Sequence, residues 1–329
     1  MKRIVVYGLG NMGRKIAKEL LNIQDKLDVS IVALMDKSVT GLELGHEVLK
    51  PDDLKQLQYD NILITSEKRY VEIKTDLITN YCVSDEKLIH LGDLLSEGEY
   101  YCNLCDNYVP FMLDTGIDSE VFSKRKIIGG GRRKNCVCPI CGGADRERWV
   151  RYVLINELHI DNKEARILHF APEEHLEHIF RKCADLDYIT ADIEEGRADI
   201  VEDITNISFE SESFDYIICN HVMEHIADEE KAFSELKRCV KKGGKIIFSV
   251  PICWEIDTYE DKNIVTEEER LNAYGQKDHV RLYGKDIAER LKEYGFQVEC
   301  YKVSEILPRD IIEKMRLISE DTTWILQPL

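Results

Sequence analysis

The sequence has no long apolar run and less positive than negative charge. No segment of its 329 residues approaches the roughly 18 consecutive apolar residues of a membrane-spanning helix, so we expect no membrane partner. Lysine and arginine number 44 against 62 aspartates and glutamates, which gives a formal net charge of −18. This balance argues against a general nucleic-acid binder, because neutralising phosphates requires a basic surface.

A secretory leader is also missing, whereas cysteine is plentiful. The chain leads directly into the apolar segment KRIVVYG, so no signal peptide is expected. Eleven cysteines without a leader indicate a reducing compartment, in which thiols are free or bind metal. We therefore expect a cytoplasmic α/β protein, and its length is sufficient for two or three domains.

Residues 1–97 have the pattern of a small nucleotide-binding domain. A strand at Arg3–Tyr7 precedes glycines at 8, 10 and 13 in a G-x-G-x-x-G spacing, and a helix follows to about Leu21. The next strand ends on Asp36, where a carboxylate can hold ribose hydroxyls. The segment resembles the short Rossmann-like domains attached to bacterial polysaccharide-modifying enzymes. Three interpretations stay open: a nucleotide or nucleotide-sugar site at Gly8, Gly10, Gly13 and Asp36, an NAD site, or a docking domain whose glycines serve only packing.

Residues 98–150 form a predicted cysteine-rich insert. Cys102 and Cys105 make one C-x-x-C pair and Cys138 and Cys141 a second, which together can complete a closed tetrahedral zinc site. A redox role is the rival interpretation, and the neighbouring Cys136 leaves the ligand assignment open by one residue pair. Between the pairs lie the basic runs 124–126 and 132–134, separated by three glycines. They are either a solvated loop or a clamp for a phosphorylated substrate or RNA.

The segment from Asp203 to Pro251 predicts a strand, a helix and a second strand. The run Tyr216–Cys219 is apolar throughout, as in a buried parallel strand, and Asn220 and His221 follow it. Ligands bind at the carboxyl ends of such strands. The segment resembles the fourth- and fifth-strand region of class I S-adenosylmethionine-dependent methyltransferases. The resemblance implies that residues 151–329 form a seven-stranded, mostly parallel, doubly wound sheet.

The same resemblance implies a cofactor site for S-adenosylmethionine. The usual G-x-G-x-G loop after the first strand is replaced here by HFAPE, a variant that resembles zinc-ribbon methyltransferases. The implied cofactor-binding residues are those of this loop, two strand-end aspartates, the residue against the adenine and one asparagine: Phe170, Ala171, Pro172, Glu173, Asp192, Asp203, Ile204 and Asn220. His221 is the candidate base for the acceptor's proton, with a packing or hydrogen-bonding histidine as the alternative.

Further motifs of that zinc-ribbon family surround the predicted sheet. Arg146 and Arg148 match its R-x-R pair, and a helix is expected over residues 147–158. Histidines at helical spacing, 175 with 178 and 221 with 225, are weaker candidates for a metal pair. The long connection after Pro251 carries polar residues that resemble acceptor contacts. The candidate substrate-binding residues are His225, Asp278, His279 and Arg281.

The sequence therefore predicts methyl transfer from S-adenosylmethionine to a small or saccharide-type acceptor, at oxygen, in surface-polysaccharide biosynthesis. Structural Zn²⁺ is the second expected cofactor, and a nucleotide or NAD in residues 1–97 the third. An RNA methyltransferase that uses the zinc ribbon and the basic loop is the first alternative. A non-catalytic scaffold that binds the cofactor is the second. The acceptor's identity and the oligomeric state stay open.

Overall fold

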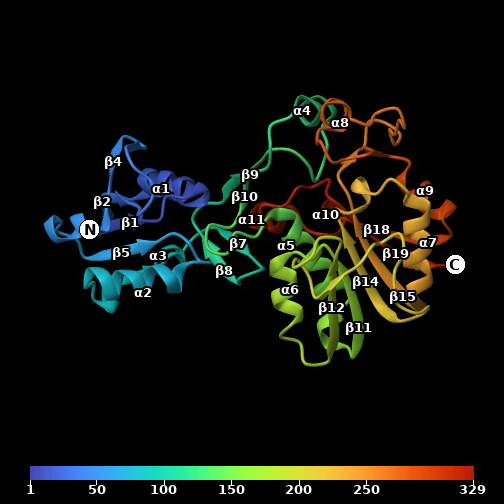
Figure 1. The fold of residues 1–329 in the computed structure, drawn as a ribbon, viewed down its shortest axis with the longest axis horizontal. Coiled ribbons are helices and arrows are strands. Elements are labelled where there is room, and N and C mark those ends of the chain that lie inside the picture. The colour runs from blue at the N-terminus through green and yellow to red at the C-terminus, as the bar shows by residue number, and fades with distance from the viewer. The chain divides into compact units, whose positions relative to one another are not determined.

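The computed structural model describes residues 1–329 and divides them into two compact units. Unit 1 comprises Met1–Leu113 and Asn135–Gly142, and unit 2 comprises Asp114–Lys134 and Gly143–Leu329. Figure 1 shows the elements of both. The division differs from the boundaries expected at 97 and 150, because the segment between the two cysteine pairs makes its contacts with unit 2.

Unit 1 is built on a six-stranded sheet in the order β3-β4-β2-β1-β5-β6, parallel except for the β3–β4 hairpin. The apolar run Ile4–Tyr7 is buried, as expected for a central parallel strand. The strands are β1 (Lys2–Tyr7), β2 (Val29–Met35), β3 (Leu42–Glu43), β4 (His46–Leu49), β5 (Asn61–Ile64) and β6 (Leu88–His90). The helices are α1 (Asn11–Ile23), α2 (Tyr70–Tyr81) and α3 (Leu91–Leu95), with short 3₁₀ turns at Pro51–Gln56 and Asp85–Lys87.

The cysteine-rich part of unit 1 follows this sheet. The antiparallel hairpin of β7 (Tyr100–Cys102) and β8 (Asn107–Val109) presents the first cysteine pair in its turn. The chain then passes into unit 2 within β9 (Leu113–Thr115) and returns within β10 (Arg133–Val137), just before the second pair. The two pairs therefore meet although 32 residues separate Cys105 from Cys138, because the intervening segment forms part of the other unit.

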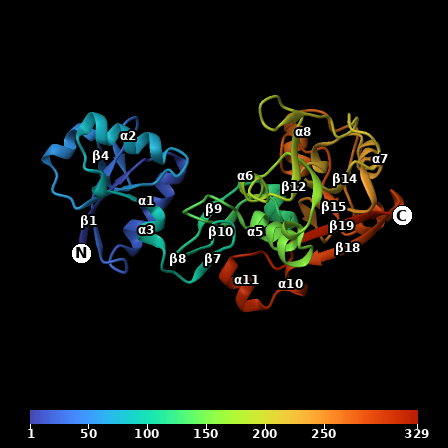
Figure 2. The same ribbon diagram turned by 90° about the horizontal axis from the view of Figure 1, so that it is seen from below.

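Unit 2 contains a seven-stranded mixed sheet in the order β13-β12-β11-β14-β15-β19-β18. Only β19 runs antiparallel to its neighbours, which confirms the predicted sheet. Figure 2 shows β18 beside β19 at one edge. The strands are β11 (Ala165–Phe170), β12 (Leu186–Asp192), β13 (Ile200–Val201), β14 (Phe214–Asn220), β15 (Val240–Ser249), β18 (Phe296–Lys302) and β19 (Thr322–Pro328).

Helices cover this sheet, with α5 and α6 on one side and α7 and α9 on the other (Figure 1). They are α5 (Asp145–Tyr152), α6 (Glu174–Phe180), α7 (Glu229–Cys239), α9 (Ile287–Glu293), α10 (Val303–Ile306) and α11 (Arg309–Met315). The helix expected over 147–158 begins earlier, because the Glu147 carboxylate accepts from the Ala144 N–H and caps it. It also gives way after Tyr152 to a π turn, Val153–Glu157. No helix of the structure is both long and apolar enough to cross a membrane.

Two segments of unit 2 that are distant in sequence, residues 114–134 and 252–283, pack on each other and are called the cap below. They contain α4 (Glu120–Arg125), β16 (Ile252–Cys253), α8 (Glu267–Tyr274) and the start of β17 (Tyr283–Gly284). Helices α4 and α8 lie side by side (Figure 1). Ile128 and Ile252 exchange both backbone hydrogen bonds, at 2.8 and 3.0 Å. The cap has its own small core: Phe122, Ile127, Cys253, Tyr274 and Leu282.

Candidate active site and metal centres

The carboxyl ends of four parallel strands meet at one edge of the unit 2 sheet. Phe170 is in register with Ala191 on one side and Cys219 on the other, and Asp192 with Val201. The residues that follow these positions therefore lie at the same edge. The predicted cofactor residues after β11, β12, β13 and β14 are brought together by the sheet register alone.

The HFAPE loop after β11 is held by its histidine. His169 is fully buried, with Nδ1 2.7 Å from the Tyr188 hydroxyl and Nε2 2.7 Å from Glu173 Oε2. One carboxylate oxygen of Glu173 is thus engaged, and the other stays available for a ligand. Ala171 has φ of 46°, a left-handed conformation that glycine adopts far more readily than alanine. Its N–H donates to the Ala191 carbonyl at 2.8 Å, which ties the loop to β12.

The two predicted strand-end aspartates differ in their surroundings. Asp192 Oδ1 accepts from the Glu194 N–H at 2.9 Å, and Arg197 lies 4.0 Å from Oδ2. Asp203 is exposed, and its Oδ1 accepts from both the backbone N–H and the hydroxyl of Thr205. Its Oδ2 is free for a ligand. Ile204 lies in the hydrophobic core of the sheet, so its side chain is largely withdrawn from any ligand.

Asn220 and His221 stand at the end of β14 with unpaired polar atoms. Asn220 is 3% exposed; its Oδ1 accepts from the Ser249 hydroxyl at 2.6 Å, whereas Nδ2 has no partner. His221 has φ of 54°, and its Nδ1 lies 3.4 Å from Glu224 Oε1 without hydrogen-bond geometry. Burial, and then the charges of Arg146 and Arg133, lower the pKa of His221 well below its usual value. Burial raises the pKa of Glu224 to about 8.

A cavity of about 330 Å³ opens beside these residues, within unit 2. One wall is the glycine run of the cap, and a Cβ on Gly129 would lie 3.4 Å from the His221 ring. The loop that the sequence left as either mobile or a clamp is therefore an ordered wall of the cavity. The polar side chains of the lining are Thr115, Arg133, Arg146, His221, Glu224, His225, Gln276 and Asp278.

Most of the basic side chains of residues 124–134 are paired with acids. Lys124 pairs with Glu120 and Lys126 with Glu255. Arg132 pairs with Asp114 and Asp118, and Arg133 with the buried Asp145 at 3.0 Å. Arg146 differs, since its guanidinium lines the cavity without a hydrogen bond or ion pair to any residue of the protein.

Three of the four predicted substrate-binding residues gather beside this cavity. The rings of His225 and His279 lie 4.8 Å apart, and His225 Nδ1 lies 3.4 Å from Asp278 Oδ2. The fourth, Arg281, is 1% exposed and donates to the carbonyls of Met223, Ile226 and Ala227 while pairing with acids. The prediction that Arg281 contacts substrate is wrong, because its donors are all used to hold the turn after β14.

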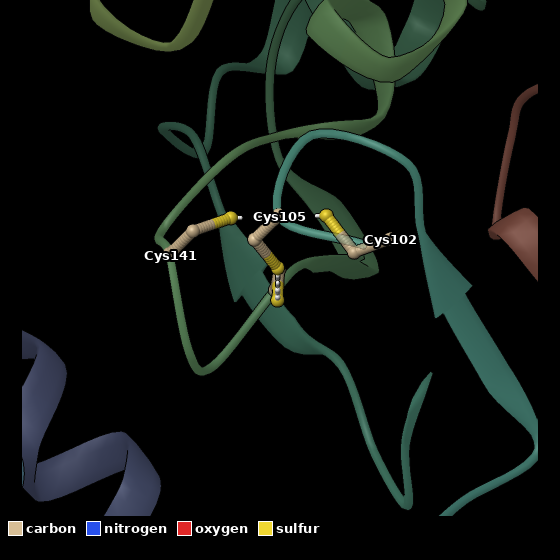
Figure 3. Close-up of side chains that lie close together, drawn as sticks. Cys102, Cys105 and Cys141 are labelled. Atoms are coloured by element: carbon tan, nitrogen blue, oxygen red, sulfur yellow. Dashed lines mark hydrogen bonds between the residues drawn. The ribbon is translucent and has the colours of Figure 1, made fainter. Parts of the chain in front are cut away.

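The four predicted cysteine ligands converge in unit 1. The Sγ atoms of Cys102, Cys105, Cys138 and Cys141 lie within 4.8 Å of one another. Figure 3 shows the side chains of Cys102, Cys105 and Cys141 close together. Cys102 Sγ lies 3.7 Å from Cys141 Sγ, and Cys105 Sγ 3.8 Å from Cys138 Sγ. These distances match the roughly 3.8 Å edge of a tetrahedron with metal–sulfur bonds of about 2.3 Å. Hydrogen bonding with Cys102 and Cys105 raises the pKa of the Cys138 thiol.

The glycine loop of unit 1 lines a separate cavity of about 560 Å³. A Cβ on Gly13 would lie 1.8 Å from the Gly8 carbonyl oxygen, so this glycine is required for helix–strand packing. A Cβ on Gly10 would have no atom within 4 Å, which leaves room for a ligand. The Asp36 carboxylate accepts from three backbone N–H groups, of Leu9, Ser38 and Val39. Burial raises the pKa of Asp36, but these bonds outweigh it and hold the pKa below its usual value.

Sequence reasoning missed several residues of the unit 2 cavity. Glu224 and the glycines at 116 and 129–131 come from two separated segments, so no local spacing relates them. The sequence offered one signal: Glu224 directly precedes His225, and both follow a buried strand end.

Comparisons with known proteins agree with the fold of unit 2. Residues 139–301 match a family model described as a methyltransferase domain, and residues 1–89 match a model described as C2185-like, N-terminal. A protein of Pyrococcus horikoshii of known structure aligns with 56% of this chain over 92% of its own length. The two are 19% identical in sequence, with a TM-score of 0.36.

Two curated relatives match parts of the chain. An uncharacterised protein of Methanocaldococcus jannaschii is 34% identical over 92 residues, which are 28% of this chain and 42% of that protein. A sterol 24-C-methyltransferase of Candida albicans is 29% identical over 167 residues, which are 49% of this chain and 39% of that protein. The chain thus spans less than half the length of either relative.

Proposed function

We propose, on the basis that residues 139–301 are a class I S-adenosylmethionine-dependent methyltransferase domain, that the chain methylates an oxygen of a small polar acceptor bound beside His221. S-adenosylmethionine supplies an electrophilic methyl group on a sulfonium centre. The observation that carries the proposal is the polar cavity next to Asn220 and His221, at the same sheet edge as Asp192.

The cofactor residues act by position and charge. Asp192 ends β12, where its carboxylate holds the ribose hydroxyls, and Asp203 Oδ2 receives the amine of the adenine. The free oxygen of Glu173 receives the α-ammonium group. Three carboxylates at one edge favour a cationic ligand. The unpaired Nδ2 of Asn220 is a donor aimed at no protein group, which supports a ligand contact there.

The lining of the cavity supports a polar acceptor, such as a saccharide. The related sterol methyltransferases are named for a sterol, an apolar substrate, whereas this cavity carries arginine, histidine, glutamate, glutamine and aspartate. The unpaired guanidinium of Arg146 favours an acceptor with a carboxylate or phosphate group. His221 is uncharged at neutral pH, so a ring nitrogen can take the hydroxyl proton as the methyl group is transferred.

The other two expected ligands belong to unit 1. We assign a structural Zn²⁺ to Cys102, Cys105, Cys138 and Cys141, because four thiols at tetrahedral spacing fit that ion. A nucleotide or NAD is assigned to the cavity at Gly8, Gly10, Gly13 and Asp36, with the open face at Gly10 as its support. A Cβ-free Gly10 allows phosphate groups to approach the amino end of α1.

The RNA alternative has less support than the small acceptor. Lys124, Lys126, Arg132 and Arg133 all pair with acids of the chain, so little free positive charge remains for a phosphate backbone. A steep loss of acceptor binding between low and moderate salt would favour RNA over the small acceptor.

Calorimetry with S-adenosylmethionine tests the cofactor site. The variant Asp192→Ala is expected to lose most of the affinity, because the ribose hydroxyls lose their acceptor. Asp187→Ala is the matched control, since Asp187 begins the same strand and its only ion pair is the surface pair with Arg166. Wild-type protein that binds no S-adenosylmethionine at millimolar ligand would overturn the proposed function. Equal affinities for wild type and Asp192→Ala would overturn the site.

A further inference from the structure

We propose that Glu224, His225 and His279 bind a divalent metal ion beside the cavity of unit 2. Each residue offers one ligand atom, and the three atoms lie within 4.8 Å of one another. A carboxylate and two imidazoles are ligands shared by Mn²⁺, Co²⁺, Ni²⁺ and Zn²⁺. This site is distinct from the four cysteines, which lie in unit 1.

The protein holds the ligands on two segments fixed to each other. Glu224 and His225 end the 3₁₀ turn Met223–His225, and His279 lies between α8 and β17. The Val280 N–H donates to the Glu224 carbonyl at 2.8 Å, next to His279. Arg281 donates to the carbonyls on either side, of Met223 and Ile226. This explains a buried arginine so close to the site: it fixes the turn that presents the ligands.

Unpaired buried atoms point to a missing ligand at the same place. Glu224 is 2% exposed, and its Oε2 has no hydrogen-bond partner. His221 Nδ1, 3.4 Å from Glu224 Oε1, has none either. A buried polar atom without a partner costs about 1–3 kcal/mol, so two of them on neighbouring side chains are rarely retained without a function. A cation next to Glu224 satisfies its carboxylate.

The neighbours of the two histidines fit ligation. His225 Nδ1 faces Asp278, through the backbone carbonyl at 3.3 Å and Oδ2 at 3.4 Å. This leaves Nε2 for the ion. In many metal sites a histidine likewise binds the ion through one ring nitrogen and donates the other N–H to a carboxylate or a backbone carbonyl. Gln276 Nε2 lies 2.7 Å from His279 Nε2, so an ion bound through that nitrogen displaces the amide. We therefore expect an exchangeable ion.

Three protein ligands leave coordination positions open toward the cavity. An acceptor oxygen bound there would lose its proton to His221 more readily, because a cation stabilises the developing alkoxide. This role rests on the proposed methyl transfer, whereas the binding of the ion does not.

Electron paramagnetic resonance of Mn²⁺ tests the site without cofactor or acceptor. Protein dialysed until one zinc equivalent per chain remains, the amount that the four cysteines hold, is titrated with Mn²⁺, and the free-ion signal reports binding. The thiolate site keeps its zinc, because thiolates favour zinc over Mn²⁺. We expect one Mn²⁺ per chain, and at least a tenfold loss of affinity in Glu224→Gln, His279→Asn and the more exposed His225→Asn. His178→Asn, on an exposed histidine of α6, is the matched control and is expected to bind as wild type does.

Two results would overturn the metal site. One is the absence of Mn²⁺ binding to wild-type protein at millimolar ion. The other is wild-type affinity in both His225→Asn and His279→Asn. Calorimetric binding of S-adenosylmethionine, measured on the same samples, shows that each variant is folded. Since that measurement needs no Mn²⁺, failure of the metal site and failure of the proposed function give different results.

Discussion

Two side chains at the candidate active site sit on backbone that non-glycine residues rarely adopt. Ala171 and His221 both have φ near +50°, at the ends of β11 and β14. Each such residue costs of order 1 kcal/mol and persists only where its surroundings fix it. The backbone N–H of each donates across the sheet, to Ala191 and Ser249 at 2.8 Å. The strain at these positions orients the HFAPE loop and the His221 ring toward the same edge.

Replacing His221 tests its role as the base. We expect His221→Asn to lower kcat by about 10²- to 10⁴-fold, because the acceptor hydroxyl loses the group that takes its proton. The measurement is transfer of labelled methyl from S-adenosylmethionine to the acceptor found by screening nucleotide sugars and small hydroxyl compounds. Cofactor affinity is expected to stay unchanged. If His221→Asn keeps the wild-type kcat, His221 is not the base and serves only in packing.

Asp321, near Asp145 and two arginines of the cavity lining, makes stability depend on pH. Burial, and then the nearby Asp145, raise its pKa to about 7, while Arg133 and Arg146 act in the opposite direction. The folded protein therefore binds a proton that the unfolded chain releases above pH 4. Because the unfolded chain binds fewer protons in this window, the free energy of unfolding falls as pH rises from about 4 to 7, by about 1.4 kcal/mol per unit of pKa difference.

Urea unfolding between pH 4.5 and 8 measures this effect. All three tryptophans, Trp149, Trp254 and Trp324, belong to unit 2, so their fluorescence follows that unit alone. The stability of wild type relative to Asp321→Asn is expected to decrease across the window, since asparagine cannot titrate. A difference independent of pH would show that Asp321 keeps an ordinary pKa.

At the scale of structural elements, the cap shapes the candidate active site. Its two segments each need the other, because α4 and α8 bury their apolar faces in one small core. The bridge between Ile128 and Ile252 then carries the glycine run across His221. The long connection after β15, expected to contact substrate, lines the cavity together with a segment from the predicted zinc insert.

Gly129 tests whether this wall controls acceptor binding. A methyl group there would lie 3.4 Å from the His221 ring and would require a strained φ of 78°. We expect Gly129→Ala to reduce methyl transfer at least tenfold and to leave S-adenosylmethionine affinity unchanged. Gly243→Ala is the matched control, because Gly243 has the same φ of 78° but no neighbouring atom within 4 Å. Equal activities of the two variants would mean that the wall does not shape the site.

At the scale of the whole molecule, the notable feature is that residues 114–134, between the two cysteine pairs, belong to unit 2. A zinc ion at the four cysteines would close the loop from which the cap segment 114–134 leaves and to which it returns. Metal binding at such a site contributes directly to folding, because the unfolded chain has no preformed site. Loss of zinc is therefore expected to loosen unit 1 first.

Zinc content and stability of a cysteine variant measure this contribution. Cys105→Ser is expected to lose the one zinc equivalent retained after dialysis, and to unfold unit 1 at lower temperature. Cys136→Ser is the control, because Cys136 is not among the four clustered sulfurs. Retention of zinc by Cys105→Ser, or its loss from Cys136→Ser, would shift the assignment to another ligand set.

Much of the fold followed from local patterns. Apolar runs such as Ile217–Cys219 predicted buried strands, and the mixed seven-stranded sheet of unit 2 is confirmed. The spacing of the two C-x-x-C pairs predicted that their four sulfur atoms come together, since four thiols at that spacing have one compact arrangement. The extent of α5 and the role of Arg281 could not be predicted, because both depend on hydrogen bonds to groups elsewhere in the chain.

The amino-acid sequence alone determined the strands, the residues at their ends and the cysteine ligands, because these depend on periodicity and short spacing. Tertiary structure decided which of those residues share a cavity. Gly129, Arg146, Glu224 and Asp278 come from four segments, and only the closing of the cap over the β14 end brings them around His221. The physical reason is that apolar burial fixes each element locally, whereas a polar site forms where separate elements happen to meet.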